Sequence, residues 1–135
     1  MKYFTIAELC KSDTATAKRI NNTPTEAVKR NLTALVDKVL DPLRELYGKP
    51  VYISSGYRCE KLNKAVGGVA NSQHLTGQAA DINQGSYTEN RRIFAYLEEY
   101  GDFDQLLWEN GGQWVHVSYR ADGKNRHQVK RLWKK

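Results

Sequence analysis

Apolar residues recur every three or four positions between residues 28 and 46, which is the spacing of one face of an α-helix. The set is Val28, Leu32, Leu35, Val36, Val39, Leu43 and Leu46. Thr23 followed by Pro24 predicts the start of this helix, and Gly48 predicts its end. Pro42 lies inside the pattern and predicts a kink or a division into two helices. We expect this long helix to be core scaffold.

Shorter helices are predicted where a Ser or Thr stands three residues before a Glu, the pattern of a capping box. These pairs are Thr5 with Glu8, and Ser86 with Glu89. After the second pair, Ile93, Phe94, Leu97 and Tyr100 form an apolar face that ends before Gly101. Segment 60–65 predicts another short helix, whereas the polar segment 12–22 is interpreted as a loop or a weak helical turn.

Runs rich in β-branched, aromatic or small apolar residues predict strands. They cover residues 50–54, 79–82, 103–109 and 114–119. The last two are joined by Asn110-Gly111-Gly112-Gln113, a strong hairpin signal. Segment 127–133 alternates basic and apolar residues and predicts an added edge strand. These elements together predict an α+β fold, with helices packed on a small, mostly antiparallel sheet.

The totals fit one globular domain over residues 1–135, because a chain of 135 residues with 40% hydrophobic residues can bury a core without covalent staples. Its two cysteines, Cys10 and Cys59, are too few for a disulfide framework or a cysteine-based zinc knuckle. We interpret them as reduced thiols packed in the fold.

A net charge of +6 favours polyanionic partners, either nucleic acid or an anionic cell wall, and charge alone does not choose between them. Much of the excess lies in segment 124–135. The first five residues lack the apolar core of a signal peptide, so cytoplasmic synthesis is expected. We expect no membrane insertion, and we expect the protein to be a monomer.

Two histidines and one aspartate are the residues with the clearest chemistry. His74 and Asp81 lie seven positions apart around a small-residue turn, and His116 lies in the apolar run Trp114-Val115-His116-Val117. Polar groups on apolar strands need partners, and a shared cation would serve both strands. Two imidazoles and one carboxylate suit zinc, with the fourth position left for water. Taken singly, each residue could equally be an ordinary surface group or a satisfied hydrogen-bond partner.

The same residues carry a resemblance to a known family. Three ordered motifs contribute: Ser54-Ser55-Gly56-Tyr57-Arg58 with Leu62-Asn63; Ser72, His74, Gly77, Ala79 and Asp81; and Trp114-Val115-His116-Val117-Ser118. Together they resemble the zinc D-alanyl-D-alanine carboxypeptidases, peptidase family M15, including phage L-alanyl-D-glutamate endolysins. The resemblance implies a Hedgehog/D-Ala-D-Ala-peptidase-like fold and a zinc peptidase that cleaves peptidoglycan stem peptides. It implies that His74, Asp81 and His116 bind zinc and that Arg58 pairs with a substrate carboxylate.

The general base is the part of the site that departs from the family pattern. Many relatives carry a carboxylate three residues before the last histidine ligand, where this chain has Gln113. Glu109 is the expected substitute, because a hairpin closed at Gly111-Gly112 would place it diagonal to His116 on one face; the alternative is a solvated glutamate at the turn. We therefore expect Glu109 and Arg58 to be catalytic, with Ser72 and Gln113 as further substrate contacts.

Two other functions stay open from the sequence. One is a zinc-containing module that binds peptidoglycan but hydrolyses it weakly or not at all, because Gln113 replaces the carboxylate. The other is a basic, metal-dependent nucleic-acid-binding protein, against which stands the lack of a nucleic-acid motif. For a cell-wall hydrolase without a signal peptide, release by phage-type lysis is the expected route to the substrate.

Overall fold

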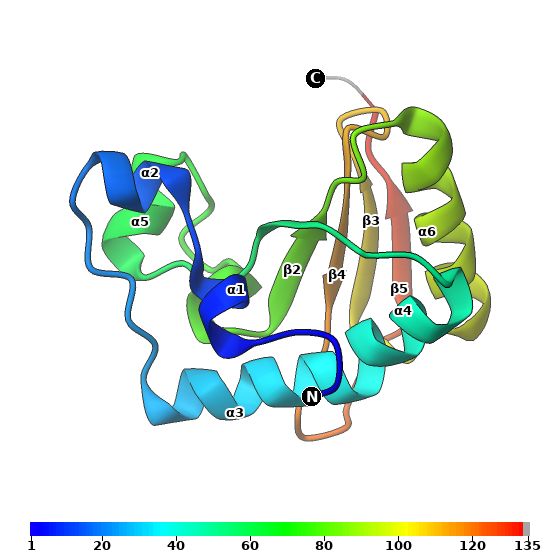
Figure 1. Ribbon diagram of the computed structural model, residues 1–135, viewed down its shortest axis with the longest axis horizontal. Coiled ribbons are helices and arrows are strands. Elements are labelled where there is room, and N and C mark those ends of the chain that lie inside the picture. The colour runs from blue at the N-terminus through cyan, green and yellow to red at the C-terminus, as the bar shows by residue number, and fades with distance from the viewer. Residues whose placement is uncertain (134–135) are drawn as a thin grey trace.

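The computed structural model describes residues 1–133, in which five strands form one sheet with the order β1-β2-β4-β3-β5 (Figure 1). The strands are β1 (Ile53–Ser55), β2 (Ala79–Ile82), β3 (Gln105–Glu109), β4 (Trp114–Ser118) and β5 (Gln128–Arg131). Neighbours pair antiparallel except β3 and β5, which pair in parallel. The prediction of helices with a mostly antiparallel sheet is confirmed, and so is the edge strand near the end of the chain.

Residues 1–133 also form a series of helical segments. They are α1 (Ile6–Cys10), α2 (Asp13–Ala17), α3 (Glu26–Leu35), η1 (Val36–Leu40), α4 (Asp41–Tyr47), α5 (Glu60–Ala65), η2 (Gln73–Thr76) and α6 (Tyr87–Tyr100). Figure 1 shows α3 running below the strands, with α4 and α6 next to each other at the right of the sheet. No helix among residues 1–133 has the length and apolar character needed to cross a membrane.

The predicted long helix is divided near Pro42, as the sequence predicts, by a change of helical winding. A π-helical segment, η1, separates α3 from α4, and Pro42 lies at the start of α4. A proline there lacks the N–H that a continuing α-helix would use. The wider π-helical turn before it accommodates this loss, and the backbone N–H of Asp41 bonds to Val36 O. Gly48 ends α4 in the left-handed conformation (φ 74°), as predicted.

The start of this helix was predicted two residues too early. Thr25, not Thr23, is the N-cap, and its hydroxyl accepts a hydrogen bond from Val28 N at 3.2 Å. Thr23 instead bonds to the Asn21 side chain, which holds the preceding loop. Both threonines have the chemistry of a cap, so only the tertiary position of the loop decides between them.

Two other boundaries also differ from the predictions. The segment predicted as loop or weak helical turn contains α2, whose N-cap Ser12 accepts a hydrogen bond from Ala15 N. The strand predicted over 50–54 is observed at Ile53–Ser55, because the amide of Tyr52 bonds to the Gln84 side chain instead of a strand neighbour. Helices α1, α5 and α6 begin where the sequence predicted them.

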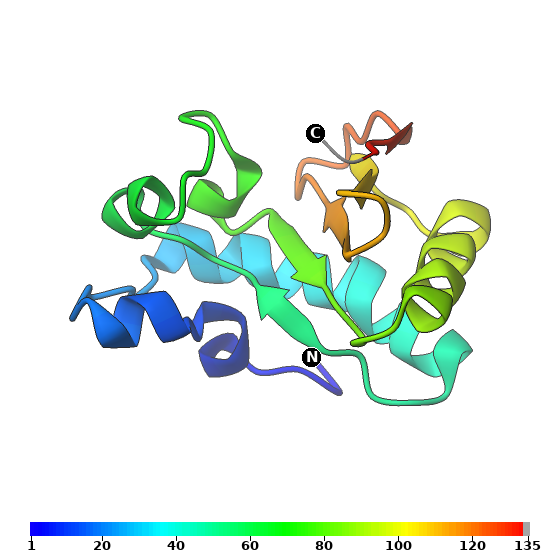
Figure 2. The same ribbon diagram turned by 90° about the horizontal axis from the view of Figure 1, so that it is seen from above.

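The sheet has one core face and one open face. Residues of β3 and β4 alternate in burial, so that Leu106, Trp108, Val115 and Val117 enter the hydrophobic core with residues of α3, η1, α4 and α6. The residues between them are only partly buried and lie on the opposite face. Figure 2 looks down the strands from one end and shows α3 and α4 along one side of the sheet. The core therefore supports the sheet from one side and leaves the other side for a site.

The β3–β4 hairpin has the predicted register, with Glu109 opposite Trp114 and Leu107 opposite His116. Its connection is not a simple two-residue turn: Asn110, Gly111 and Gly112 all have positive φ values (47°, 67° and 97°). Gly112 also packs against Trp108, where a Cβ atom would come within 2.2 Å of the ring. This close approach explains a glycine at that place.

Candidate metal centre and cleft

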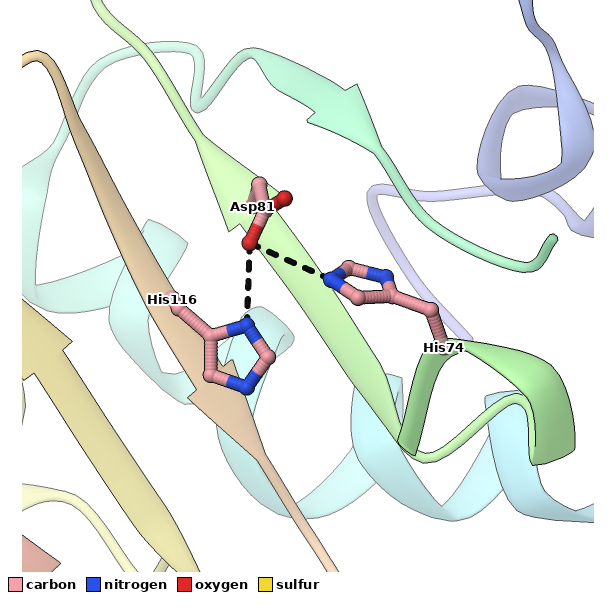
Figure 3. Close-up of side chains that lie close together, drawn as sticks. All are labelled: His74, Asp81 and His116. Atoms are coloured by element: carbon pink, nitrogen blue, oxygen red, sulfur yellow. Dashed lines mark hydrogen bonds and ion pairs between the residues drawn. The ribbon is translucent and has the colours of Figure 1, made fainter. Parts of the chain in front are cut away.

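Three elements bring His74, Asp81 and His116 together on the open face of the sheet (Figure 3). The β2–β4 register places Asp81 directly opposite His116, and η2 holds His74 beside them. Asp81 Oδ1 lies 3.0 Å from His116 Nδ1 and 3.3 Å from His74 Nε2. One potential ligand atom from each residue lies within 4.8 Å of the other two. A single cation could contact all three.

The His74 ring is fixed in one orientation. Its Nδ1 lies 2.6 Å from the carbonyl oxygen of Gly56, which can only accept a hydrogen bond, so Nδ1 carries the proton. In the neutral imidazole, Nε2 then presents a lone pair toward Asp81 Oδ1, another acceptor. Two facing acceptors repel each other unless a proton or a cation lies between them. This arrangement is the usual one for a metal-binding histidine, whose other nitrogen donates to a carbonyl or carboxylate.

All three side chains are nearly enclosed, with exposed fractions of 3% for His74, 14% for Asp81 and 12% for His116. Burial alone would raise the pKa of Asp81. When His74 also carries a proton on Nε2, its charge and the hydrogen bonds from both imidazoles outweigh burial and hold the pKa of that carboxyl well below its usual range. The carboxylate therefore stays ionised and ready to face a cation.

The donor set fits zinc. Two imidazole nitrogens and one carboxylate oxygen are borderline ligands of the kind found in zinc sites with an open position. The His74 ring already has the hydrogen bond that orients it. Among the described residues, the group of possible metal ligands does not include Cys59. The three ligands would therefore leave the fourth coordination position of a zinc ion open.

The three side chains lie in a cleft of about 1000 Å³. Its polar lining includes Arg58, Ser72, Gln73, His74, Gln78, Asp81, Asp104, Gln105, Glu109, His116, Arg120 and Arg126. Trp114 and Leu107 also line it, whereas Trp108 is buried in the core. The volume is that of a site for a small molecule or a short peptide.

Arg58 and Ser72 line the same cleft as the cluster, and their contact with substrate stays a prediction. Arg58 N donates to the carbonyl of His74 at 3.0 Å, and its guanidinium approaches Ser72 Oγ at 3.5 Å. Ser72 Oγ also accepts from His74 N at 3.1 Å. Burial lowers the pKa of Arg58, and its Nε has no hydrogen-bond partner among the described residues. The guanidinium therefore has unused capacity to bind an anion.

Glu109 and Gln113 are separated by the fold. Glu109 lines the cleft and shares a sheet face with His116. Gln113 is exposed at the hairpin turn, where its side chain bonds to Asn110, and it is absent from the cleft lining. Gln113 does not belong to the described lining, so its contact with substrate stays a prediction that the cleft does not support.

The cleft contains a second polar cluster that sequence reasoning did not predict, formed by Gln73, Asp104 and Arg126. Asp104 is fully buried, and it accepts hydrogen bonds from the Arg126 backbone and guanidinium and from Gln73 Nε2. The Arg126 side chain is the main reason that the pKa of Asp104 falls to about 2. An aspartate inside the apolar run 103–109 was the available signal, because a buried carboxylate needs a partner.

Comparison with known proteins agrees with this geometry. A family model described as Peptidase M15 matches residues 2–118. The zinc D-Ala-D-Ala carboxypeptidase of Streptomyces albus G is 38% identical over 87 residues, which are 62% of this chain and 32% of that protein. The chain thus spans about a third of the length of this curated relative. The match to the family model covers most of the chain, and the protein belongs to the peptidase M15 family.

Proposed function

We propose that this protein is a zinc-dependent peptidase that hydrolyses peptide bonds in the stem peptides of bacterial peptidoglycan. The observation that carries the proposal is the convergence of two imidazoles on one oxygen of Asp81, inside a cleft of peptide size. Family membership supports the peptidase activity. The name of the Streptomyces relative, a D-Ala-D-Ala carboxypeptidase, supports zinc and the substrate class.

His74, Asp81 and His116 would hold the metal through Nε2, a carboxylate oxygen and Nδ1. When bound, zinc polarises a carbonyl group and lowers the pKa of a coordinated water molecule to about 7. The protein supplies the orientation: Gly56 fixes the His74 ring, and the β2–β4 register fixes Asp81 against His116. These contacts keep the ligands in place before the metal binds.

Glu109 would accept and return a proton, because its carboxylate lines the same cleft and no other residue in the described hydrogen-bond network holds it. Arg58 would orient the substrate through a carboxylate, with Ser72 supporting its guanidinium. Glu109 in this role compensates for the glutamine at position 113.

Digestion of purified peptidoglycan tests this function. The zinc-loaded protein should release stem-peptide fragments, identified by mass, and a chelator should stop the release until zinc is restored. The masses also distinguish an L-Ala-D-Glu endopeptidase from a D-Ala-D-Ala carboxypeptidase. Binding of zinc and wall fragments without any product would instead identify a binding module, and salt-sensitive DNA nicking would identify a metal nuclease.

A further inference from the structure

The cleft has two chemically different ends. Glu109 and Trp114, the last residue of β3 and the first of β4, line it at the hairpin turn. Arg120 and Arg126 line it at the opposite end, just after β4 and just before β5. His116 lies between the two ends in the middle of β4. An extended peptide lying along β4 would therefore meet the metal cluster in its middle and two arginines at one end.

Arg126 is built as a rigid anion-binding group. Its Nε and Nη2 bond to the two oxygens of Asp104 at 3.0 and 2.8 Å, and Asp104 itself is fully buried. A guanidinium held along one edge in this way keeps its other edge in a fixed direction. The Nη1 atom makes no hydrogen bond to another described residue, and 53% of the side chain is exposed. Its free edge is available to a ligand.

Arg120 adds a second guanidinium at the same end. It pairs with Asp122 at 2.8 Å through Nη2, and its backbone amide is held by the Asn125 side chain. The Asp122 pair is exposed on both sides, so it competes only weakly with a ligand carboxylate.

The charges of the lining agree with an anionic ligand. The lining carries three positive and three negative side chains, which cancel in charge. The arginines are Arg58, Arg120 and Arg126, and the carboxylates are Asp81, Asp104 and Glu109. A bound zinc ion adds two positive charges to this neutral lining. The loaded cleft is then complementary to a ligand with two negative charges, one of which Arg58 would take.

We propose that Arg120 and Arg126 form a second carboxylate subsite, so that the preferred substrate is an extended acidic peptide and not only its terminal dipeptide. Arg120 follows His116 by four residues, which corresponds to about 13 Å along a strand. An extended peptide covers this distance in about four residues. The recognised carboxylate therefore lies about three to four residues from the scissile bond. This inference rests on the proposed peptidase function and deepens it.

Two synthetic pentapeptides provide the test. Both end in D-Ala-D-Ala and carry a D-glutamyl residue at the second position, with its α-carboxylate free in one peptide and amidated in the other. Their dissociation constants are measured by calorimetry on zinc-loaded protein carrying Glu109→Gln, and mass spectrometry verifies that the peptides stay intact. The peptide with the free carboxylate should bind about tenfold more tightly than the amidated peptide, which is the effect of one charge-assisted contact.

Substitutions in the same background locate the effect. Arg120→Gln should reduce the preference, and the double variant Asp104→Asn with Arg126→Gln should reduce it further, because it removes the guanidinium without leaving a buried charge. Arg92→Gln is the control, since Arg92 has a similar exposed fraction (50%) and lies on α6 away from the cleft. The Arg92→Gln variant should prefer the peptide with the free carboxylate as strongly as the Glu109→Gln protein does.

Equal binding of the two peptides, or a preference that survives both arginine variants, would overturn the subsite. The outcome is separate from that of the proposed function. If wild-type protein with zinc cuts neither peptidoglycan nor these peptides, the peptidase proposal fails, and the binding ratio still decides whether the arginines recognise a carboxylate.

Discussion

The Nδ1 atom of His74 lies 2.6 Å from the carbonyl oxygen of Gly56, and this contact ties the metal cluster to the first helix of the chain. Gly56 packs so tightly on α1 that an added Cβ atom would lie 2.1 Å from the carbonyl oxygen of Leu9. Backbone cannot move out of the way as a flexible side chain can. The orientation of the His74 ring therefore depends on Gly56, which is not itself one of the three proposed metal ligands.

Gly56→Ala should displace this backbone and weaken zinc binding by about 10- to 100-fold, the usual cost of losing a contact that orients a histidine ligand. Zinc affinity measured by competition with a chelating dye checks the expectation. Gly48→Ala is the matched control, because Gly48 has a positive φ but no neighbour within 4 Å and lies at the end of α4. It should lower the melting temperature and leave zinc affinity unchanged; equal effects on affinity would count against the Gly56 explanation.

Glu109→Gln should lower turnover about 10²- to 10⁴-fold, the contribution of a general acid–base, while zinc stays bound. The substitution keeps the size of the side chain and removes only its ability to accept a proton. Gln113→Ala provides the comparison, because Gln113 lies outside the cleft, and it should retain activity. Release of stem-peptide fragments and zinc content per chain are the two measurements. Undiminished turnover in the Glu109 variant would remove this residue from the mechanism.

Zinc should stabilise the folded protein, because the three ligands converge only in the native state. At a free zinc concentration 100-fold above the dissociation constant, the gain in the free energy of unfolding is about 2.7 kcal/mol. Thermal unfolding with zinc and with a chelator measures this gain. Asp81→Asn should abolish most of it, whereas Asp122→Asn, which changes an exposed aspartate outside the cluster, should preserve it. A full zinc effect in the Asp81 variant would contradict the proposed ligand set.

Asp104 should make stability depend on acid pH. Because its pKa falls to about 2 in the folded state, mainly through the Arg126 side chain, the folded protein holds this carboxyl in its charged form more strongly than the unfolded chain does. Its contribution is therefore complete above pH 4 and is lost as the pH falls toward 2. We expect ionised Asp104 to contribute about 1 to 2 kcal/mol to the free energy of unfolding. This figure is reduced for solvent screening because Arg126 is half exposed.

Denaturant unfolding between pH 2 and pH 5 measures this dependence, with Asp104→Asn compared to the parent protein at each pH. The difference between the two proteins should shrink as the pH approaches 2, while other carboxyl groups affect both alike. A difference that stays constant over this range would show that the Arg126 pair does not control the titration of Asp104.

Local signals in the sequence predicted most of the elements correctly, because caps, apolar spacing and turn residues act over a few positions. The hairpin register is the clearest case: it placed Glu109 on the same face as His116, and the structure has the same pairing. Boundaries that depend on distant contacts were less accurate. Thr23 and Thr25 are equally good caps in isolation, and only the loop contacts of Asn21 separate them.

The sequence by itself determined the three candidate ligands and the strands that carry Asp81 and His116, because alternating burial exposes a polar residue that needs a partner. Only the tertiary structure decided that Gly56 orients His74, that Gln113 bonds to Asn110 outside the cleft lining, and that Arg126 meets Asp104 inside it. These relationships join residues between 3 and 22 positions apart. The two longer-range contacts arise from loop packing, and the direction of Gln113 depends on the geometry of a single turn, neither of which leaves a periodic pattern in the chain.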